Sequence, residues 1–317
     1  MKGAKMRKLF GLTLAVAAVT GFIAGTAWTE DIQVGVAYFG KSGMSERVLS
    51  GMKDKLNEIA PAIKVEYQEA LENEEAFAAV VDRFQKEKAG MVIMRSGGAE
   101  WLAKNPPSIP TFIGACNHPA QLGAVKNLDA PEGNITGVTY FLPRETQFEI
   151  FKLLISDMDS LFLLTEEGHP SSDIDEAETK ALCTKMGLKY NGKKCSSVDD
   201  VLAAIDANKD SVSVFIIGSQ NLLMENTDKF TAKYPDEIFL AYASEPVKSG
   251  ALGGFVADDY KLGVFLAQSM ADVLVNGKQV SEVPVKVDPD PKFFVNVKVA
   301  ERLGISIPYE IQDLCIT

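Results

Sequence analysis

The sequence predicts an α/β protein of two similar lobes, each built on a parallel sheet. Apolar runs of strand length alternate with amphipathic helical stretches from residue 32 to 115, and again from 161 to 274. That alternation is typical of parallel sheets with helices on both faces. A stretch rich in Gly, Pro and Asn, residues 117–143, separates the two halves, and 317 residues suffice for two lobes of ordinary domain size.

The N-terminus has the three parts of a secretory signal peptide. The first eight residues carry four positive charges and no negative ones, residues 9–25 are almost wholly apolar, and the small residues Gly25, Thr26 and Ala27 follow. The apolar stretch is shorter than the roughly 20 residues of a spanning helix. We therefore expect residues 1–27 to be cleaved, the mature chain to begin at or near Trp28, and the protein to be periplasmic. No Cys lies near this site, so a lipoprotein is not expected.

In the first lobe, strands and helices are expected to alternate along the chain. Strands are expected at 32–39, 63–67, 91–94 and 109–115, and helices at 45–59, 74–88 and 99–104. Ser45 is placed to cap the first helix. Phe77, Val80, Val81 and Phe84 give the second helix one apolar face.

The second lobe repeats this plan. Strands are expected at 161–165, 188–193, 212–217 and 238–242, and helices at 173–186, 198–207, 222–233 and 260–274. A Gly-rich stretch at 249–257 is interpreted as a second crossing between lobes. The resulting boundaries assign 28–141 and 258–317 to the first lobe, and 142–257 to the second.

Charge excludes one class of partner. The formal net charge is −11, and removal of the four signal-peptide cations brings it to about −15. So acidic a chain repels phosphate backbones, which disfavours nucleic-acid binding.

Four cysteines follow the signal: Cys116, Cys183, Cys195 and Cys315. An even count in an oxidising compartment suggests disulfides. We predict a Cys183–Cys195 pair, because Cys183 lies late in one helix and Cys195 just past the next strand. Two buried or exposed thiols are the alternative. With two histidines and no CxxC motif, no metal site is expected.

One motif resembles a phosphate-binding loop. Residues 35–42 match G-x-x-x-x-G-K-S. The residues between the two glycines are themselves apolar strand material, so we expect no nucleotide site and no cofactor. The chain has neither a G-x-S-x-G elbow nor H-E-x-x-H, and we predict a binding protein and not an enzyme.

Candidate ligand-binding residues follow the strands, since ligands bind beyond the carboxyl ends of strands in open α/β sheets. Ser96, Gly97 and Gly98 lie between a strand and a helix, where backbone N–H groups bind carboxylates, although an ordinary tight turn would have the same sequence. Tyr38 and Phe39 end the first strand and could stack on a planar ligand, with core packing as the alternative. The other candidates are Ser42, Asn117, His118, Thr165, Glu166, Ser219, Gln220, Ser244, Glu245 and Asp258, the last with helix capping as its alternative.

Three segments resemble one family of bacterial ABC-transporter substrate-binding proteins. They are the Gly133-Asn134-Ile135-Thr136-Gly137 run, the residues Asp258, Tyr260, Leu262 and Gly263 of a D-x-Y-x-LG pattern, and the ending from Asn296 to Pro308. The family includes tryptophan- and tyrosine-binding members. The resemblance implies a type I periplasmic-binding-protein fold, with two Rossmann-like lobes joined by three segments, and an inner-membrane ABC permease as partner.

The chain departs from that family at two expected ligand positions. His118 stands where the family usually has Asp before Pro, and Thr165-Glu166 where it often has Tyr-Asn. We therefore predict a monomeric periplasmic solute-binding protein for a small polar or zwitterionic ligand, amino acid-like and possibly aromatic. The alternative is a periplasmic sensor. In that case a membrane receptor, and not a permease, would recognise the form in which the two lobes have closed on the ligand.

Overall fold

The structure is a computed structural model, and it describes residues 31–38, 42–68, 71, 73–312 and 315–316. The predicted signal peptide at 1–27 and the candidate Phe39 lie outside the described residues. Residues 31–317 belong to one compact unit. Within the described part of the chain, no helix has the length and apolar character needed to cross a membrane.

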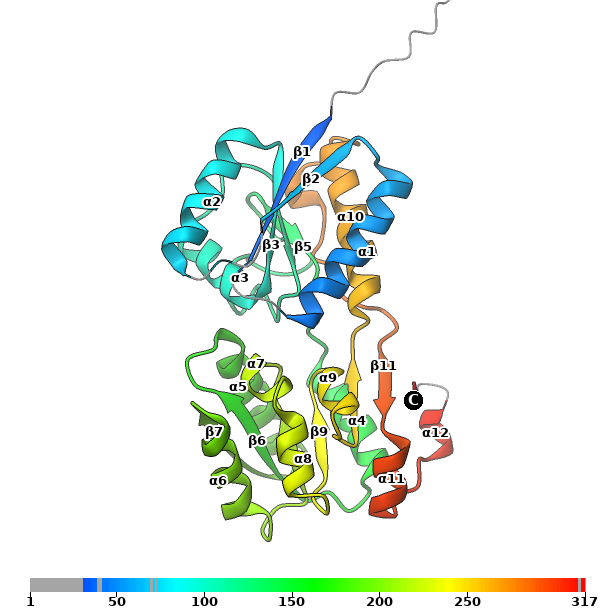
Figure 1. Cartoon of the computed structure of the whole chain (residues 1–317). Coiled ribbons are helices and arrows are strands. Elements are labelled where there is room, and N and C mark those ends of the chain that lie inside the picture. The colour runs from blue at the N-terminus through cyan, green and yellow to red at the C-terminus, as the bar shows by residue number, and fades with distance from the viewer. Residues whose placement is uncertain (1–30, 39–41, 69–70, 72, 313–314, 317) are drawn as a thin grey trace, which may run out of the picture. The chain divides into compact units, whose positions relative to one another are not determined.

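The first sheet is parallel and has the strand order β2-β1-β3-β4-β5. Its strands are β1 (Ile32–Ala37), β2 (Ile63–Tyr67), β3 (Gly90–Met94), β4 (Thr111–Gly114) and β5 (Ile135–Gly137). The helices around it are α1 (Gly43–Ile59), α2 (Glu74–Glu87), α3 (Arg95–Lys104) and α10 (Asp259–Leu274). We call this sheet and its helices the first lobe (Figure 1).

Successive side chains of a strand point to opposite faces of the first sheet, so the helices form one layer on each face. Along β3, Val92 and Met94 pack in the cluster that contains α1 and α10, whereas Met91 and Ile93 pack in the cluster that contains α2 and α3. The four helices therefore cover opposite faces of the sheet in pairs, as Figure 1 shows. Tyr38 belongs to the α1 face, where it is 1% exposed.

The second sheet has the order β12-β11-β10-β9-β8-β6-β7, parallel except where β10 meets β11. Its strands are β6 (Ser160–Glu166), β7 (Lys189–Cys195), β8 (Val214–Ile217), β9 (Phe239–Ala241), β10 (Gly253–Val256), β11 (Lys292–Val295) and β12 (Cys315–Ile316). Its helices are α4 (Arg144–Leu154), α5 (Pro170–Met186), α6 (Val198–Asn208), α7 (Asn221–Met224), α8 (Thr227–Lys233), α9 (Glu245–Lys248), α11 (Val297–Leu303) and α12 (Tyr309–Gln312). We call this sheet and these helices the second lobe. A short 3-10 helix, η1 (Val280–Glu282), lies between α10 and β11 along the chain.

The structure differs from the sequence expectation near the C-terminus. The sequence predicts that all of 258–317 belongs to the first lobe, but β11 and β12 extend the second sheet. Phe293 and Val295 on β11 are buried, and β11 pairs antiparallel with β10, so the last segment returns to the second lobe after α10. The stretch 249–257, expected to be a crossing, contains β10.

Some helix boundaries also differ from those expected from the sequence. Ser42 and not Ser45 caps α1, since Ser42 Oγ accepts the N–H of Ser45 at 3.1 Å. Helix α3 begins at Arg95, four residues before the expected start, and the expected helix 222–233 is two helices, α7 and α8.

The D-x-Y-x-LG pattern is explained by packing of α10 against α1. A Cβ at Gly263 would overlap the carbonyl oxygen of Val48, and the Tyr260 hydroxyl donates to Asp54 at 3.0 Å. Leu262 is fully buried, and Asp258 Oδ1 accepts the N–H of Lys261 at 3.1 Å as the cap of α10. The pattern therefore specifies close contact between two helices of the first lobe.

The predicted Cys183–Cys195 disulfide is wrong. Both residues, like Cys116, are buried free thiols. Cys183 packs in the hydrophobic cluster on one face of the second sheet, and Cys195 packs in the cluster on the other face. Because helix α5 and the end of β7 direct the two thiols to opposite sides of the sheet, a bond between them is excluded.

Candidate functional site

A small cavity lies where strand ends of both sheets meet. The first lobe supplies Ser42, Met44, Arg95, Ser96 and Ala115. The second lobe supplies His169, Ser219, Asn221 and Met224, and Tyr140 comes from the segment that joins β5 to α4. The cavity volume is about 20 Å³. A single water needs roughly 10–15 Å³, so a larger molecule would enter only if these walls moved apart.

Four other hollows among the described residues are larger, at about 550, 420, 320 and 100 Å³, and each lies within one lobe. One of about 550 Å³ is walled mainly by Val247, Phe294 and Val297, and one of about 420 Å³ includes Thr165 and Tyr190. None of the four is lined by residues of both lobes. The smaller cavity is the better candidate, because polar groups from the carboxyl ends of both sheets converge on it.

Arg95 is the charged residue that sequence reasoning missed. It follows the fully buried strand β3 and starts α3 with φ 75°, a conformation that is uncommon for a residue with a side chain. Ala115, at the end of the adjacent strand β4, has φ 48° and lines the same cavity. Such strained backbone persists where the surroundings enforce it, often at binding sites. A lone basic residue directly after a buried strand was the available signal.

Arg95 is half-buried beside the cavity. Burial lowers the pKa of its guanidinium, while Tyr140, Glu166 and Glu225 act on it in the opposite direction. An arginine stays charged even so, and a desolvated guanidinium is a strong partner for carboxylates because it offers paired N–H donors.

Of the predicted turn at 96–98, only Ser96 lines the cavity. Its Oγ accepts the backbone N–H of Asn117 at 3.1 Å. A Cβ at Gly98 would lie 2.6 Å from Ile93 Cγ2, so that glycine faces the core, whereas a Cβ at Gly97 would meet nothing within 4 Å. All three residues belong to the first turn of α3.

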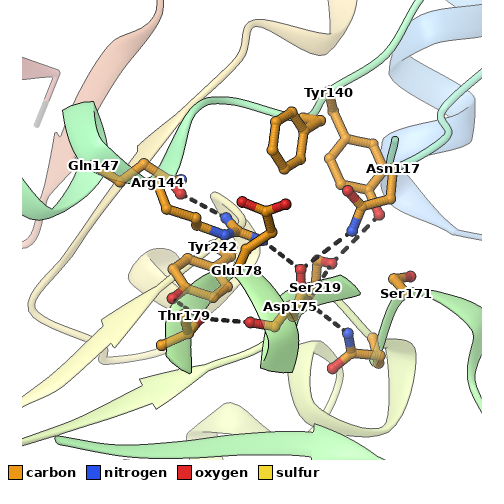
Figure 2. A network of polar contacts seen from close by, with 12 residues as sticks. Asn117, Tyr140, Arg144, Gln147, Ser171, Asp175, Glu178, Thr179, Ser219 and Tyr242 are labelled. Atoms are coloured by element: carbon orange, nitrogen blue, oxygen red, sulfur yellow. Dashed lines mark hydrogen bonds and ion pairs between the residues drawn. The ribbon is translucent and has the colours of Figure 1, made fainter. Parts of the chain in front are cut away.

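A buried carboxylate, Asp175, organises the polar groups beside the cavity (Figure 2). Its Oδ1 accepts from Asn117 Nδ2 at 3.2 Å, and its Oδ2 accepts from Ser219 Oγ at 3.1 Å and Gln220 Nε2 at 2.7 Å. Asn117 follows β4 of the first lobe, while Ser219 and Gln220 follow β8 of the second. The sequence candidates Asn117, Ser219 and Gln220 are therefore brought together by a residue that was not predicted.

Arg144 provides the counter-charge of Asp175. The two form an ion pair with side chains 5% and 0% exposed. The guanidinium also lies 3.7 Å from the centroid of the Tyr242 ring, a cation–π contact, and donates to Gln147 Oε1 at 2.5 Å. Among the described residues, Asn117 Oδ1 and Gln220 Oε1 remain buried acceptors without a hydrogen-bond partner.

Two ring side chains complete the cavity wall. The Tyr140 hydroxyl lies 3.3 Å from Ser219 Oγ, and burial raises the pKa of Tyr140 to about 12. His169 caps α5, with Nδ1 accepting the N–H of Ser171 at 3.2 Å, and burial lowers the pKa of its imidazole. The other histidine, His118, is outside the cavity wall and meets the Phe141 ring edge-on at 4.6 Å between centroids.

The remaining candidates have other contacts. The Tyr38 hydroxyl donates to Glu46 at 3.0 Å within the α1 layer, and Glu166 Oε2 accepts the N–H of Leu222 at 3.1 Å. Asp258 is exposed at its helix cap. Glu245, whose Oε2 lies 3.3 Å from Ser244 Oγ, forms an ion pair with Arg47 of α1. That last pair joins the two lobes outside the cavity.

The cavity wall is rich in polar groups. It offers a guanidinium, an imidazole, three serine hydroxyls, a phenol, an amide and two thioethers. Among the described residues, no group of three or more His, Cys, Asp and Glu side chains is arranged to hold a metal ion.

Comparison with known proteins identifies the family of this chain. The family model described as ABC transporter substrate binding protein matches residues 33–315. A tyrosine-binding protein of Clostridioides difficile is 23% identical over 260 residues, which cover 81% of this chain and 75% of the relative.

Solved structures show the same fold. A Streptococcus pneumonia ABC domain in complex with L-Trp has a TM-score of 0.80 at 22% identity, covering 90% of this chain and all of that one. A conserved domain protein of Vibrio cholerae has a TM-score of 0.77 at 21% identity, covering 90% of this chain and 99% of that one. The fold is that of type I periplasmic binding proteins. With its family model matched over almost the whole described chain, this protein belongs to the ABC transporter substrate-binding protein family.

Proposed function

We propose that this protein is the periplasmic substrate-binding component of an ABC importer. Its ligand is a small polar molecule with a carboxylate, amino acid-like and possibly aromatic, and it binds in the cavity between the lobes. The observation that carries the proposal is the placement of Arg95 beside Ser96 and Ser219, where the strand ends of both sheets converge.

Arg95 is the group that would hold the carboxylate. Its half-buried guanidinium can form two parallel N–H···O bonds with a carboxylate, which few other side chains can do. Ser96 and the first turn of α3 add donors on the same side, since N–H groups at a helix N-terminus favour anions. Each charge-assisted bond contributes about 1.5–3 kcal/mol.

Closure of the two lobes is the expected mechanism. Contacts between the lobes are made by Asn117 with Asp175 and by Arg47 with Glu245. The cavity of about 20 Å³ is too small for an amino acid, so the ligand would enter with the lobes further apart and would be enclosed by a hinge motion. The pneumococcal relative, in complex with L-Trp, and the clostridial relative, a tyrosine-binding protein, support a ligand of amino-acid size.

Export and partnership complete the proposal. The predicted signal peptide would send the mature chain, from about Trp28, to the periplasm, where the closed form would deliver its ligand to an inner-membrane permease. The family to which the chain belongs supports the permease. The mature protein is proposed to be monomeric.

The first experiment identifies the ligand. Native mass spectrometry of protein purified from periplasm should show a small molecule of defined mass that is lost on denaturation, and N-terminal sequencing should begin near Trp28. Calorimetry with the recovered molecule should give at least a tenfold weaker Kd for Arg95→Gln. Arg83→Gln is the matched control, because Arg83 pairs with Glu66 and neither residue lines the cavity. Equal affinity of both variants would place the site elsewhere.

A sensor role is the second candidate, since a membrane receptor could read the same closure. Uptake of labelled ligand, measured in cells with and without the partner permease, separates the importer from the sensor. Uptake that persists without any permease contradicts the importer.

A further inference from the structure

The cavity wall contains no carboxylate among the described residues that line it. Its charged and ionisable members are Arg95, His169 and Tyr140, and the rest are hydroxyl, amide, thioether and methyl groups. A free α-amino acid carries an ammonium as well as a carboxylate. A buried ammonium needs an opposite charge close by, because desolvation otherwise disfavours its charged form.

Asp175, Glu166 and Glu225 act electrostatically on Arg95 or His169, and each has other surroundings. Asp175 accepts from four residues, Arg144 among them, and is fully buried. Glu166 accepts the N–H of Leu222 with Oε2 and also acts electrostatically on Arg95. Glu225 is exposed at the end of α7. An ammonium in the cavity would instead lie near a guanidinium, and like charges repel.

We propose that the ligand is a small organic anion, a carboxylate that lacks the α-ammonium group, such as a 2-oxo acid or a 2-hydroxy acid. The inference rests on the proposed function and narrows its ligand class. Arg95 binds the carboxylate, Ser96 and Ser219 provide hydroxyl partners for an oxo or hydroxyl oxygen, and the thioethers of Met44 and Met224 contact the apolar part.

Matched ligands test this proposal directly. Calorimetry compares each amino acid with the 2-oxo and 2-hydroxy acids of the same side chain, for alanine, leucine and phenylalanine. We expect at least one oxo or hydroxy acid to bind ten times more tightly than its amino acid. Arg95→Gln should abolish both the binding of that acid and the preference for it. Arg95→Lys should recover part of the affinity, because it restores the charge but not the paired donors.

A second variant reverses the chemistry. Asn221→Asp places a carboxylate in the cavity wall at the start of α7, with almost no change in side-chain size. It should weaken binding of the anion and improve binding of the matched amino acid, so that the preference between them shifts at least tenfold. A merely structural role of Asn221 would weaken both ligands alike, and that outcome would count against the proposal.

The inference and the proposed function fail differently. An amino acid that binds the wild-type protein more tightly than its oxo and hydroxy counterparts overturns the anion proposal and leaves solute binding intact. A co-purifying ligand that has no carboxylate does the same. If no small molecule co-purifies and none of these compounds binds, both proposals are overturned.

Discussion

The side-chain amide of Asn117 donates to the buried carboxylate of Asp175 over 3.2 Å, and this bond joins the end of β4 in the first lobe to α5 in the second. Asp175 is fully buried and holds its other partners, Ser219, Gln220 and Arg144, on the second-lobe side. One carboxylate therefore fixes polar groups of both lobes beside the cavity.

Replacing Asp175 should be strongly destabilising. Asp175→Asn leaves the Arg144 guanidinium, 5% exposed, without its counter-charge, and breaking a buried pair in this way costs about 3–5 kcal/mol. Urea unfolding of the two proteins measures the loss. Asp173→Asn is the control on the same helix, since Asp173 is exposed and pairs with Lys194, and it should cost at most about 1 kcal/mol. Equal costs for both variants would contradict the prediction.

Asp259 should make stability depend on pH near neutrality. Burial raises its pKa to about 7, against the opposing effect of Arg47. The folded state then binds more protons than the unfolded state between the unfolded pKa of about 4 and the folded pKa. The free energy of unfolding that Asp259 contributes therefore falls as pH rises through this window.

Asp259→Asn isolates that effect. The free energy of unfolding of the variant, relative to wild type, should increase as pH rises from 4 to 7 and level off above it. The comparison is made by chemical denaturation at each pH. Asp258→Asn is the adjacent control, because Asp258 is exposed, and a pH trend of the same size in that variant would refute the assignment to Asp259.

A side chain at Gly263 should separate α1 from α10. In Gly263→Ala the new Cβ would overlap the Val48 carbonyl oxygen, which is backbone and cannot turn away. Overpacking of this kind costs about 1–3 kcal/mol. Gly97→Ala, where a Cβ meets nothing within 4 Å, should be neutral or slightly stabilising because alanine suits a helix better. Thermal unfolding checks both, and a Tm for Gly263→Ala at or above wild type would be the contrary result.

The thiols of Cys183 and Cys195 should be free but unreactive in the folded protein. Both are buried, and burial raises the pKa of each to about 11, so little thiolate forms at neutral pH. Iodoacetamide should modify neither residue in buffer and both in urea, without added reductant, as read by mass spectrometry of peptides. A disulfide-linked Cys183–Cys195 peptide would contradict the prediction that both thiols are free.

The regular framework could be predicted because it is encoded locally. Alternating apolar runs such as 161–165 and the periodic face of 74–88 decide which segments are strands and helices, whatever lies around them. The rule that ligands meet the carboxyl ends of parallel strands then identified Ser42, Ser96 and Ser219, all of which line the cavity. The family motifs predict the fold better than they predict the site, because residues of the D-x-Y-x-LG pattern pack α10 against α1.

Only the tertiary structure decided which polar groups converge and which pair elsewhere. Arg95 reaches the cavity through a strained backbone that no periodicity reveals, and Asp175 meets Asn117 and Arg144 across separations of 58 and 31 residues. Cys183 and Cys195 are close in sequence, yet the sheet separates them onto opposite faces. Sequence determines local conformation through short-range sterics and capping, whereas burial, ion pairing and the assembly of a site depend on contacts between distant segments.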